Sequence, residues 1–140
     1  MIVVKLEDTS RANDATPTDD PDLTLNIPAT GTYRIRALLR PYTTSNTPQI
    51  KWGFSAPAFS FARRLTIGGR DDDFDVGSVK TDLVTPEAMD LSENTAYQYI
   101  IDVLATFTGT GTFALQWSQN NSNATATTLR AGSWMQADAI

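Results

Sequence analysis

The sequence predicts an all-β domain, built as an antiparallel β-sandwich or barrel. Apolar and polar residues alternate with a period of two through most of the chain, which is the pattern of half-buried strands. Turns rich in Gly, Pro and Asn separate about eight such segments. No stretch of helix length carries a 3.6-residue period. Together these observations indicate packed sheets.

Composition limits the classes of protein to consider. A chain of 140 residues fits one domain, with 41% hydrophobic and 19% charged residues. No window approaches the ~20 apolar residues of a membrane helix, and the N-terminus lacks the apolar core of a signal peptide. We therefore expect no membrane partner, and synthesis and assembly in the cytoplasm.

Several kinds of chemistry are missing. The absence of Cys and His removes disulfides, thiolate sites and the commonest general base and metal ligand. No glycine-rich loop with a following Lys-Ser/Thr is present to hold phosphates. Asp82 and Asp102 could form a glycosidase pair, but nothing around them favours it. A net charge of −5 opposes nucleic-acid binding. We expect no enzyme activity and no cofactor.

The N-terminal part of the chain is strongly polar. Residues 2–6 could form a short strand, and Glu7–Asp22 is rich in Asp, Thr and Pro, with no large apolar side chain that could hold a core. This composition predicts an extended arm over residues 1–22, which becomes ordered only by lying on the domain or on a partner. The sandwich domain is then expected over residues 23–140.

The next strands carry an arginine row. Strands are predicted at Leu23–Ile27 and at Tyr33–Leu39, and the opposite face of the second one carries Arg34, Arg36 and Arg40. This row is either a solvated face paired with nearby carboxylates or a contact with acidic surface on a neighbouring subunit or partner. Arginine suits the second role because its planar fork pairs bidentately with carboxylates.

The middle of the chain is the least regular part. Strands are predicted at Ile50–Phe54 and Phe59–Ile67, a short strand at Val79–Val84, and one helical turn within residues 86–94.

Between these segments lies an acidic loop with Asp71, Asp73 and Asp75. Its spacing resembles a calcium loop, but the glycine is one place late and the last ligand is Asp82 rather than Glu. A solvated loop opposite arginines is the simpler account, so no metal site is predicted. The arginines meant are Arg63, Arg64 and Arg70.

The longest alternation is at Tyr97–Phe107. A Gly-Thr-Gly turn and a second alternating run, Phe113–Trp117, follow it, so the pair is predicted to form a hairpin. The polar run 119–128 should cross a sheet edge, and 129–134 should bring the chain back as a closing strand. Two apolar residues, Ile100 and Leu104, lie on the outer face of the long strand and should be covered by the domain or by another subunit.

The alternation also predicts the core. Its inward rows contain aromatic and branched residues on four segments, and Trp134 is left open between core and surface. The predicted core residues are Tyr33, Ile35, Trp52, Phe54, Tyr99, Ile101, Val103, Phe113, Leu115 and Trp117.

The C-terminal residues carry a resemblance to a known group. Segments 115–120, 124–128 and 130–134 resemble the C-terminal signature of small jelly-roll proteins of tailed bacteriophages, which are decoration (cement) or fibre-tip proteins. Runs 8–12 and 19–23 are similar to the opening of the same group. The resemblance implies a jelly roll, a homotrimer and a place on the virion. It distinguishes the jelly roll from an immunoglobulin-like sandwich, which periodicity cannot do.

From the resemblance and the residues we expect a capsid decoration protein. It would bind the major capsid protein on the outer capsid surface as a trimer, through its arm and its arginine face, and bridge capsid subunits. The alternative is a tail-fibre or head-fibre tip that binds a host receptor or glycan. The expected capsid contacts are Ile2, Val4, Arg11, Asp19, Asp20, Asp22, Arg34, Arg36 and Arg40, and the expected subunit contacts are Ile100 and Leu104.

Overall fold

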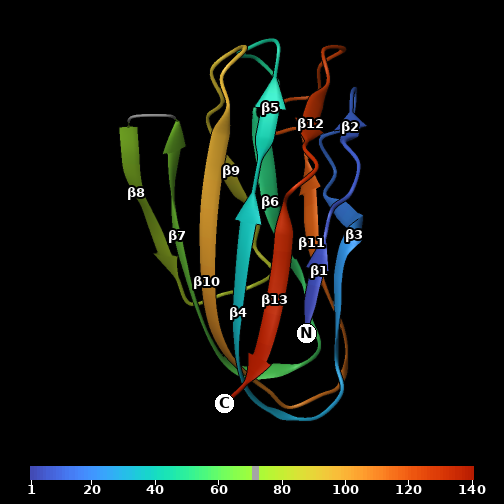
Figure 1. Ribbon diagram of the computed structural model, residues 1–140, viewed down its shortest axis with the longest axis vertical. Coiled ribbons are helices and arrows are strands. Elements are labelled where there is room, and N and C mark those ends of the chain that lie inside the picture. The colour runs from blue at the N-terminus through green and yellow to red at the C-terminus, as the bar shows by residue number, and fades with distance from the viewer. Residues whose placement is uncertain (71–72) are drawn as a thin grey trace.

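The computed structural model describes residues 1–70 and 73–140, with side chains described outside residues 70–78. Its regular elements are strands, shown in Figure 1. In chain order they are β1 (Ile2–Val4), β2 (Thr9–Arg11), β3 (Thr18–Ile27), β4 (Gly31–Leu39), β5 (Pro41–Thr43), β6 (Ile50–Ser55), β7 (Phe59–Arg70), β8 (Asp73–Lys80), β9 (Glu87–Met89), β10 (Tyr97–Phe107), β11 (Gly111–Ser118), β12 (Thr127–Leu129) and β13 (Trp134–Ala139).

The strands form an antiparallel sandwich, as predicted. A six-stranded sheet has the order β1-β13-β4-β10-β7-β8, and a four-stranded sheet has the order β3-β11-β6-β9. Figure 1 shows the larger sheet in front of the smaller one, with the short strands β2, β12 and β5 at the upper end. No helix in the described ranges is long and apolar enough to cross a membrane.

The predicted hairpin of the two long strands is wrong. β10 pairs with β4 and β7 in the larger sheet, whereas β11 pairs with β3 and β6 in the smaller one. The apolar side chains of β10 and β11 therefore meet across the core, as the Phe107 and Phe113 rings do at 5.9 Å. Gly111, with φ +136°, begins β11 after the chain has crossed between sheets.

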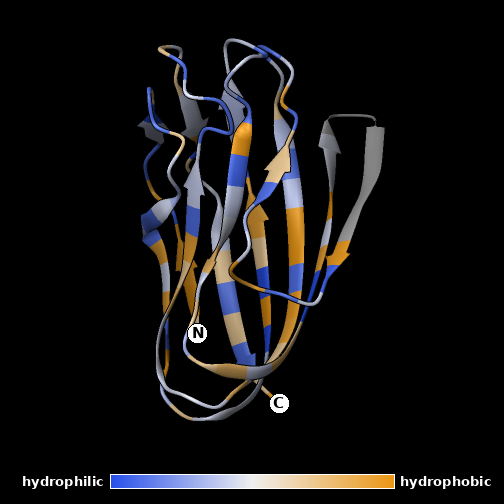
Figure 2. Ribbon diagram, turned by 180° about the vertical axis from the view of Figure 1, so that it is seen from behind, coloured by the Kyte–Doolittle hydropathy of each residue, from blue (hydrophilic) through white to orange (hydrophobic). Residues whose placement is uncertain are grey.

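The predicted core is confirmed. All ten predicted core residues are buried, and side chains from both sheets form one cluster between them. Figure 2 shows the apolar and polar residues alternating along the long strands. On β10 the buried positions recur at every second residue from Tyr99 to Phe107. This period of two is what lets one face of each sheet fill the core.

The N-terminal arm does not stand apart from the domain. β1 pairs with β13 and β2 with β12, and the predicted boundary after Asp22 falls inside β3. The segment has few apolar side chains, but its backbone groups find partners on strand edges of the domain. Of the two alternatives for its ordering, the structure shows the first, in which the segment lies on the domain.

Three local predictions are also wrong. Of the strand predicted at 79–84, residues 79–80 end β8 and residues 81–84 leave the strand, because Asp82 accepts hydrogen bonds from the backbone N–H groups of Val84 and Thr85, which makes a turn. Residues 86–94 contain β9 rather than a helical turn, since Glu87–Met89 pairs with β6. The closing strand runs from 134 to 139, because a turn with Gly132 at φ +82° separates it from β12.

Candidate binding surface on the outer face of the larger sheet

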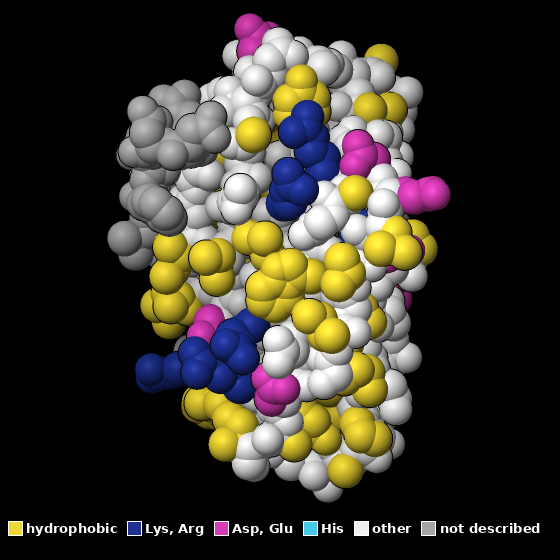
Figure 3. All heavy atoms as spheres, in the orientation of Figure 1, with side chains coloured by type: hydrophobic (Ala, Val, Ile, Leu, Met, Phe, Trp, Pro, Cys, Tyr) yellow, Lys and Arg dark blue, Asp and Glu magenta, His cyan; other side chains and the backbone are white. Residues whose placement is uncertain are grey.

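An apolar row crosses the outer face of the six-stranded sheet. Its members are cross-strand neighbours on β1, β13, β4, β10 and β7, and they are Val4, Trp134, Leu38, Ile100 and Ile67. Ile100 is 50% exposed and Val4 46% exposed. Figure 3 shows hydrophobic side chains gathered in a band across the middle of this face. We call this set the apolar row.

Charged side chains lie next to the apolar row. The guanidinium of Arg34 on β4 donates hydrogen bonds to the Asp102 carboxylate on β10 through both Nε and Nη2. The distance from Nε to Oδ1 is 3.1 Å. Arg36 lies 3.4 Å from Asp138 on β13. The Asp102 hydrogen bond and charge raise the pKa of Arg34, and hydrogen bonds from Gln136 and then Arg36 lower the pKa of Asp138. All four side chains remain partly exposed, so each pair contributes little to stability.

The structure brings six predicted contact residues onto this one face. Leu104 lies between Arg34 and Arg63 in the register of β4, β10 and β7. Ile2 extends the face on β1, opposite Gln136. The predicted residues on this face are Ile2, Val4, Arg34, Arg36, Ile100 and Leu104.

Arg40 and Arg11 do not belong to the exposed face. Arg40 follows β4 and donates to the Ala131 carbonyl at 2.7 Å. Arg11 stacks on Trp117, with its Cζ 4.3 Å from the ring centroid, and donates to the Trp117 and Thr18 carbonyls. These guanidinium groups hold the upper end of the sandwich together.

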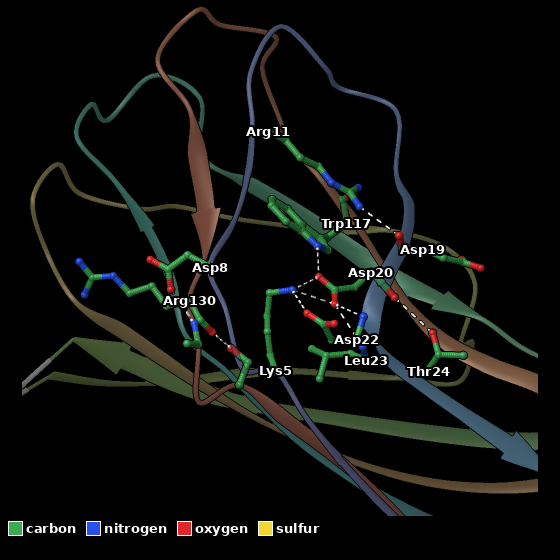
Figure 4. Close-up of polar contacts among 12 residues, drawn as sticks. Lys5, Asp8, Arg11, Asp19, Asp20, Asp22, Leu23, Thr24, Trp117 and Arg130 are labelled. Carbon is green, nitrogen blue, oxygen red and sulfur yellow. Dashed lines mark hydrogen bonds and ion pairs between the residues drawn. The ribbon is translucent and has the colours of Figure 1, made fainter.

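The predicted acidic contacts also differ from one another. Asp20 is fully buried, so its prediction as a capsid contact is wrong. Its carboxylate accepts from Lys5 and from the Trp117 indole N–H, shown in Figure 4. Asp22 shares the same Lys5 ammonium at 2.8 Å but is partly exposed. Asp19 is exposed and accepts from Gln116.

Sequence reasoning missed two kinds of residue. Trp134, Leu38 and Ile67 complete the apolar row, yet the row becomes visible only when the strand register is known, because its members are far apart in the chain. Lys5 is buried although it is charged. Its position in phase with Val3, opposite to Ile2 and Val4, is the available sequence signal that it points inward.

Arg64 is a second buried cation. It lies on the inner face of β7, donates to the Leu83 carbonyl at 3.2 Å and pairs with Glu87 at 3.4 Å. Its Cζ sits 4.8 Å from the centroid of the Trp52 ring. Burial lowers the pKa of this guanidinium. The prediction that Arg64 faces the acidic loop in solvent is wrong, because the pleat of β7 points it into the sandwich.

The described residues contain no cluster of three or more acidic, His or Cys side chains placed to hold a metal. The calcium interpretation of Asp71, Asp73 and Asp75 lies outside the described side chains.

No protein-family model matches the chain, and a search of curated proteins found no match. The outer face of the larger sheet is therefore the best-defined candidate site.

Proposed function

We propose that this chain is a structural virion protein, a capsid decoration protein that acts as a trimer and bridges capsid subunits on the outer surface. The observation that carries the proposal is the apolar row. It crosses five strands on the outer face of the larger sheet, beside arginine–aspartate ion pairs. Exposed apolar patches rimmed by polar residues are typical of protein contacts. The C-terminal resemblance to phage decoration proteins supplies the partner.

We infer that the sandwich is a jelly roll. Eight strands carry this inference, and they are β3, β4, β6, β7, β8, β9, β10 and β11. Numbered one to eight in chain order, the strands of the smaller sheet lie in the order 1-8-3-6, which is β3-β11-β6-β9. Those of the larger sheet lie in the order 2-7-4-5, which is β4-β10-β7-β8. Strands that are neighbours in the chain thus mostly lie in opposite sheets, as in two interlocked Greek keys. This order supports a jelly roll over a sandwich built from simple hairpins.

The apolar row provides the subunit contact of the proposed trimer. Trp134 and Ile100 are neighbours across Leu38, and a partly exposed Trp among branched residues is the kind of anchor that dominates interface energies. Leu104 extends this patch toward the arginines. A second subunit that covers the row would remove its apolar surface from water.

The arginines beside the row provide the capsid contact. Arg34 and Arg36 hold their carboxylate partners at the surface, where exchange for an acidic group on another protein costs little. Arg63 is exposed and makes no ion pair within the described part of the chain. Three subunits would multiply a weak contact of this kind through effective concentration.

The trimer is tested by Ile100→Asp, with Val84→Asp as the matched control, because the two residues are 50% and 49% exposed. Light scattering at micromolar concentration should give three times 15.3 kDa for the wild type and the control. Ile100→Asp should give one chain. A wild-type mass of one chain would end the trimer proposal.

The capsid contact is tested by co-sedimentation of the protein with purified capsids. We expect Arg34→Glu with Arg36→Glu to abolish pelleting, and Lys51→Glu, on the smaller sheet, to leave it unchanged. Point variants are needed because residues 1–22 supply β1, β2 and part of β3. Binding to host cells or glycans, with no capsid binding by the wild type, would favour the fibre-tip alternative.

A further inference from the structure

The larger sheet has an open edge at β1. On its inner side β1 pairs with β13, where Ala137 N–H donates to the Met1 carbonyl at 2.9 Å and Lys5 N–H donates to the Ser133 carbonyl at 2.8 Å. Because partners alternate along an antiparallel strand, the N–H and C=O groups of Ile2 and Val4 point away from β13. Within the described residues, no hydrogen bond joins these outward groups to another part of the chain.

This edge strand is short, at three residues, and it lacks the other devices that usually protect an edge. Proteins block such edges with exposed Lys, Pro or bulges. Here the exposed side chains are Ile2, 59% exposed, Val4, and Leu6 just beyond the strand, 82% exposed. The Lys5 side chain points into the sandwich, where Asp20 and Asp22 hold it. The edge is therefore open, short and apolar.

A groove of about 550 Å³ adjoins this edge. It lies between β1, the segment that follows it and the beginning of β3. Val3, Val4 and Pro21 give it apolar walls, whereas Glu7, Asp8 and Asp22 give it carboxylates, and no lining residue is a cation. Asp22 keeps 41% of its side chain exposed although it pairs with Lys5. The groove thus joins unpaired backbone groups, apolar surface and negative charge.

We propose that the β1 edge and its groove bind an extended peptide segment of another protein, with basic side chains alternating with small apolar ones. The peptide adds a strand beside β1 through its backbone, as in β-augmentation. Its apolar side chains lie on the outer face beside Ile2 and Val4, and its Lys or Arg side chains, on the opposite face of the added strand, meet Glu7 and Asp22 in the groove. This inference does not depend on the proposed virion function.

A second copy of the chain is the less suitable occupant of this edge. A second copy would bring to the contact the same acidic groove, whose lining contains Glu7, Asp8 and Asp22 and no cation. The net charge of −5 adds repulsion between two copies. Charge complementarity therefore selects a basic partner segment.

The test uses a labelled eight-residue peptide with alternating Lys and Val, and a matched peptide with Glu in place of Lys. Fluorescence anisotropy at low salt should show binding of the basic peptide only. Amide exchange measured by NMR should show new protection at Ile2 and Val4 in the complex. Absence of binding, or equal binding of both peptides, would overturn the proposal.

Two variants locate the bound peptide. Val4→Pro removes an outward N–H that makes no internal bond, so we expect at least tenfold weaker binding, while Val4→Thr keeps the N–H and should bind as the wild type does. Glu7→Lys, outside the apolar row, should also weaken binding at least tenfold, and it remains informative if Val4→Pro fails to fold. Unchanged affinity of Glu7→Lys, or a dimer that uses this edge instead, contradicts the proposal.

Discussion

Lys5 and Asp20 form an ion pair in which neither side chain reaches solvent, with Nζ 3.1 Å from Oδ2. Lys5 follows β1 of the larger sheet, and Asp20 belongs to β3 of the smaller one, so the pair ties the two sheets together. The Trp117 indole and the backbone N–H groups of Asp22 and Leu23 complete the hydrogen bonding of Asp20.

The first prediction concerns this pair. Lys5→Met should lower the free energy of unfolding by about 3–5 kcal/mol, because it leaves the Asp20 carboxylate buried without its cation. Urea unfolding at pH 7 measures the change. Arg36→Met is the control, since it breaks only an exposed pair and should cost about 0–1 kcal/mol. Adding Asp20→Asn to Lys5→Met should recover part of the loss, and two equal losses in Lys5→Met and Arg36→Met would contradict the assignment.

The second prediction compares neighbours on β10. Ile101 is fully buried, whereas Ile100 is half exposed on the outer face. Ile101→Ala should therefore cost about 2–5 kcal/mol of stability through lost burial and a new cavity. Ile100→Ala should cost less than about 1 kcal/mol in the monomer. Thermal and urea unfolding of both variants check the order, and a reversed order would place the wrong face of β10 in the core.

The third prediction concerns the close approach of β7 and β10. A Cβ at Gly68 would lie 2.2 Å from Tyr99 Cδ1 and 2.6 Å from the Gln98 carbonyl oxygen. The backbone atom cannot give way easily, so Gly68→Ala should cost about 1–3 kcal/mol. Gly109→Ala is the control, since its nearest neighbours lie at 3.4 Å. Equal stability of the two variants would show that the strands separate freely at Gly68.

The fourth prediction concerns pH. Hydrogen bonds from the Thr85 side chain, then from the Val84 backbone, lower the pKa of Asp82 below its ordinary value of 3.8. The folded chain therefore holds this carboxylate ionised more strongly than the unfolded chain does. Its stabilisation is complete above pH 3.8 and is lost as the pH falls through the lower folded value.

Asp82→Asn should accordingly lower the free energy of unfolding at pH 7. The difference from the wild type should shrink as the pH approaches 2. Urea midpoints measured across that range provide the check. Thr85→Val should reproduce part of the loss at pH 7, because it removes the hydroxyl that donates to the carboxylate. A difference in urea midpoint between the wild type and Asp82→Asn that stays constant with pH would refute this account of Asp82.

The sequence was sufficient to predict the strands and the core, because burial on one face imposes a period of two on each strand. Ile101 and Trp117 could be placed inside from that period alone. Pairing could not be predicted in the same way. A turn such as Gly109–Gly111 allows both a hairpin and a crossing between sheets, and only the partners of β10 and β11 decide between them.

The candidate surface was predicted in part. The alternation placed two apolar residues, Ile100 and Leu104, on an outward strand face that should be polar. It also placed the charged residues Arg34 and Arg36 on the outward face of the neighbouring strand. Trp134 was not assignable, since its neighbours in the row come from distant strands. The N-terminal segment was predicted to lie on the domain or on a partner, and side-chain polarity could not decide between the two, because backbone pairing holds β1 and β2 to the domain.

The pairing of β1 with β13 also constrains how the chain folds during synthesis. Residues 2–4 leave the ribosome long before their partners at 134–136 are made. At about 5–20 residues per second, the first strand waits roughly 7–26 s for its partner. During this time an Ile-Val-Val segment has no edge to join, so nascent chains should depend on chaperones or slow release. Ribosome-bound chains that stop at residue 130 should show no exchange protection at Val3, and protection there would mean that β1 finds another partner first.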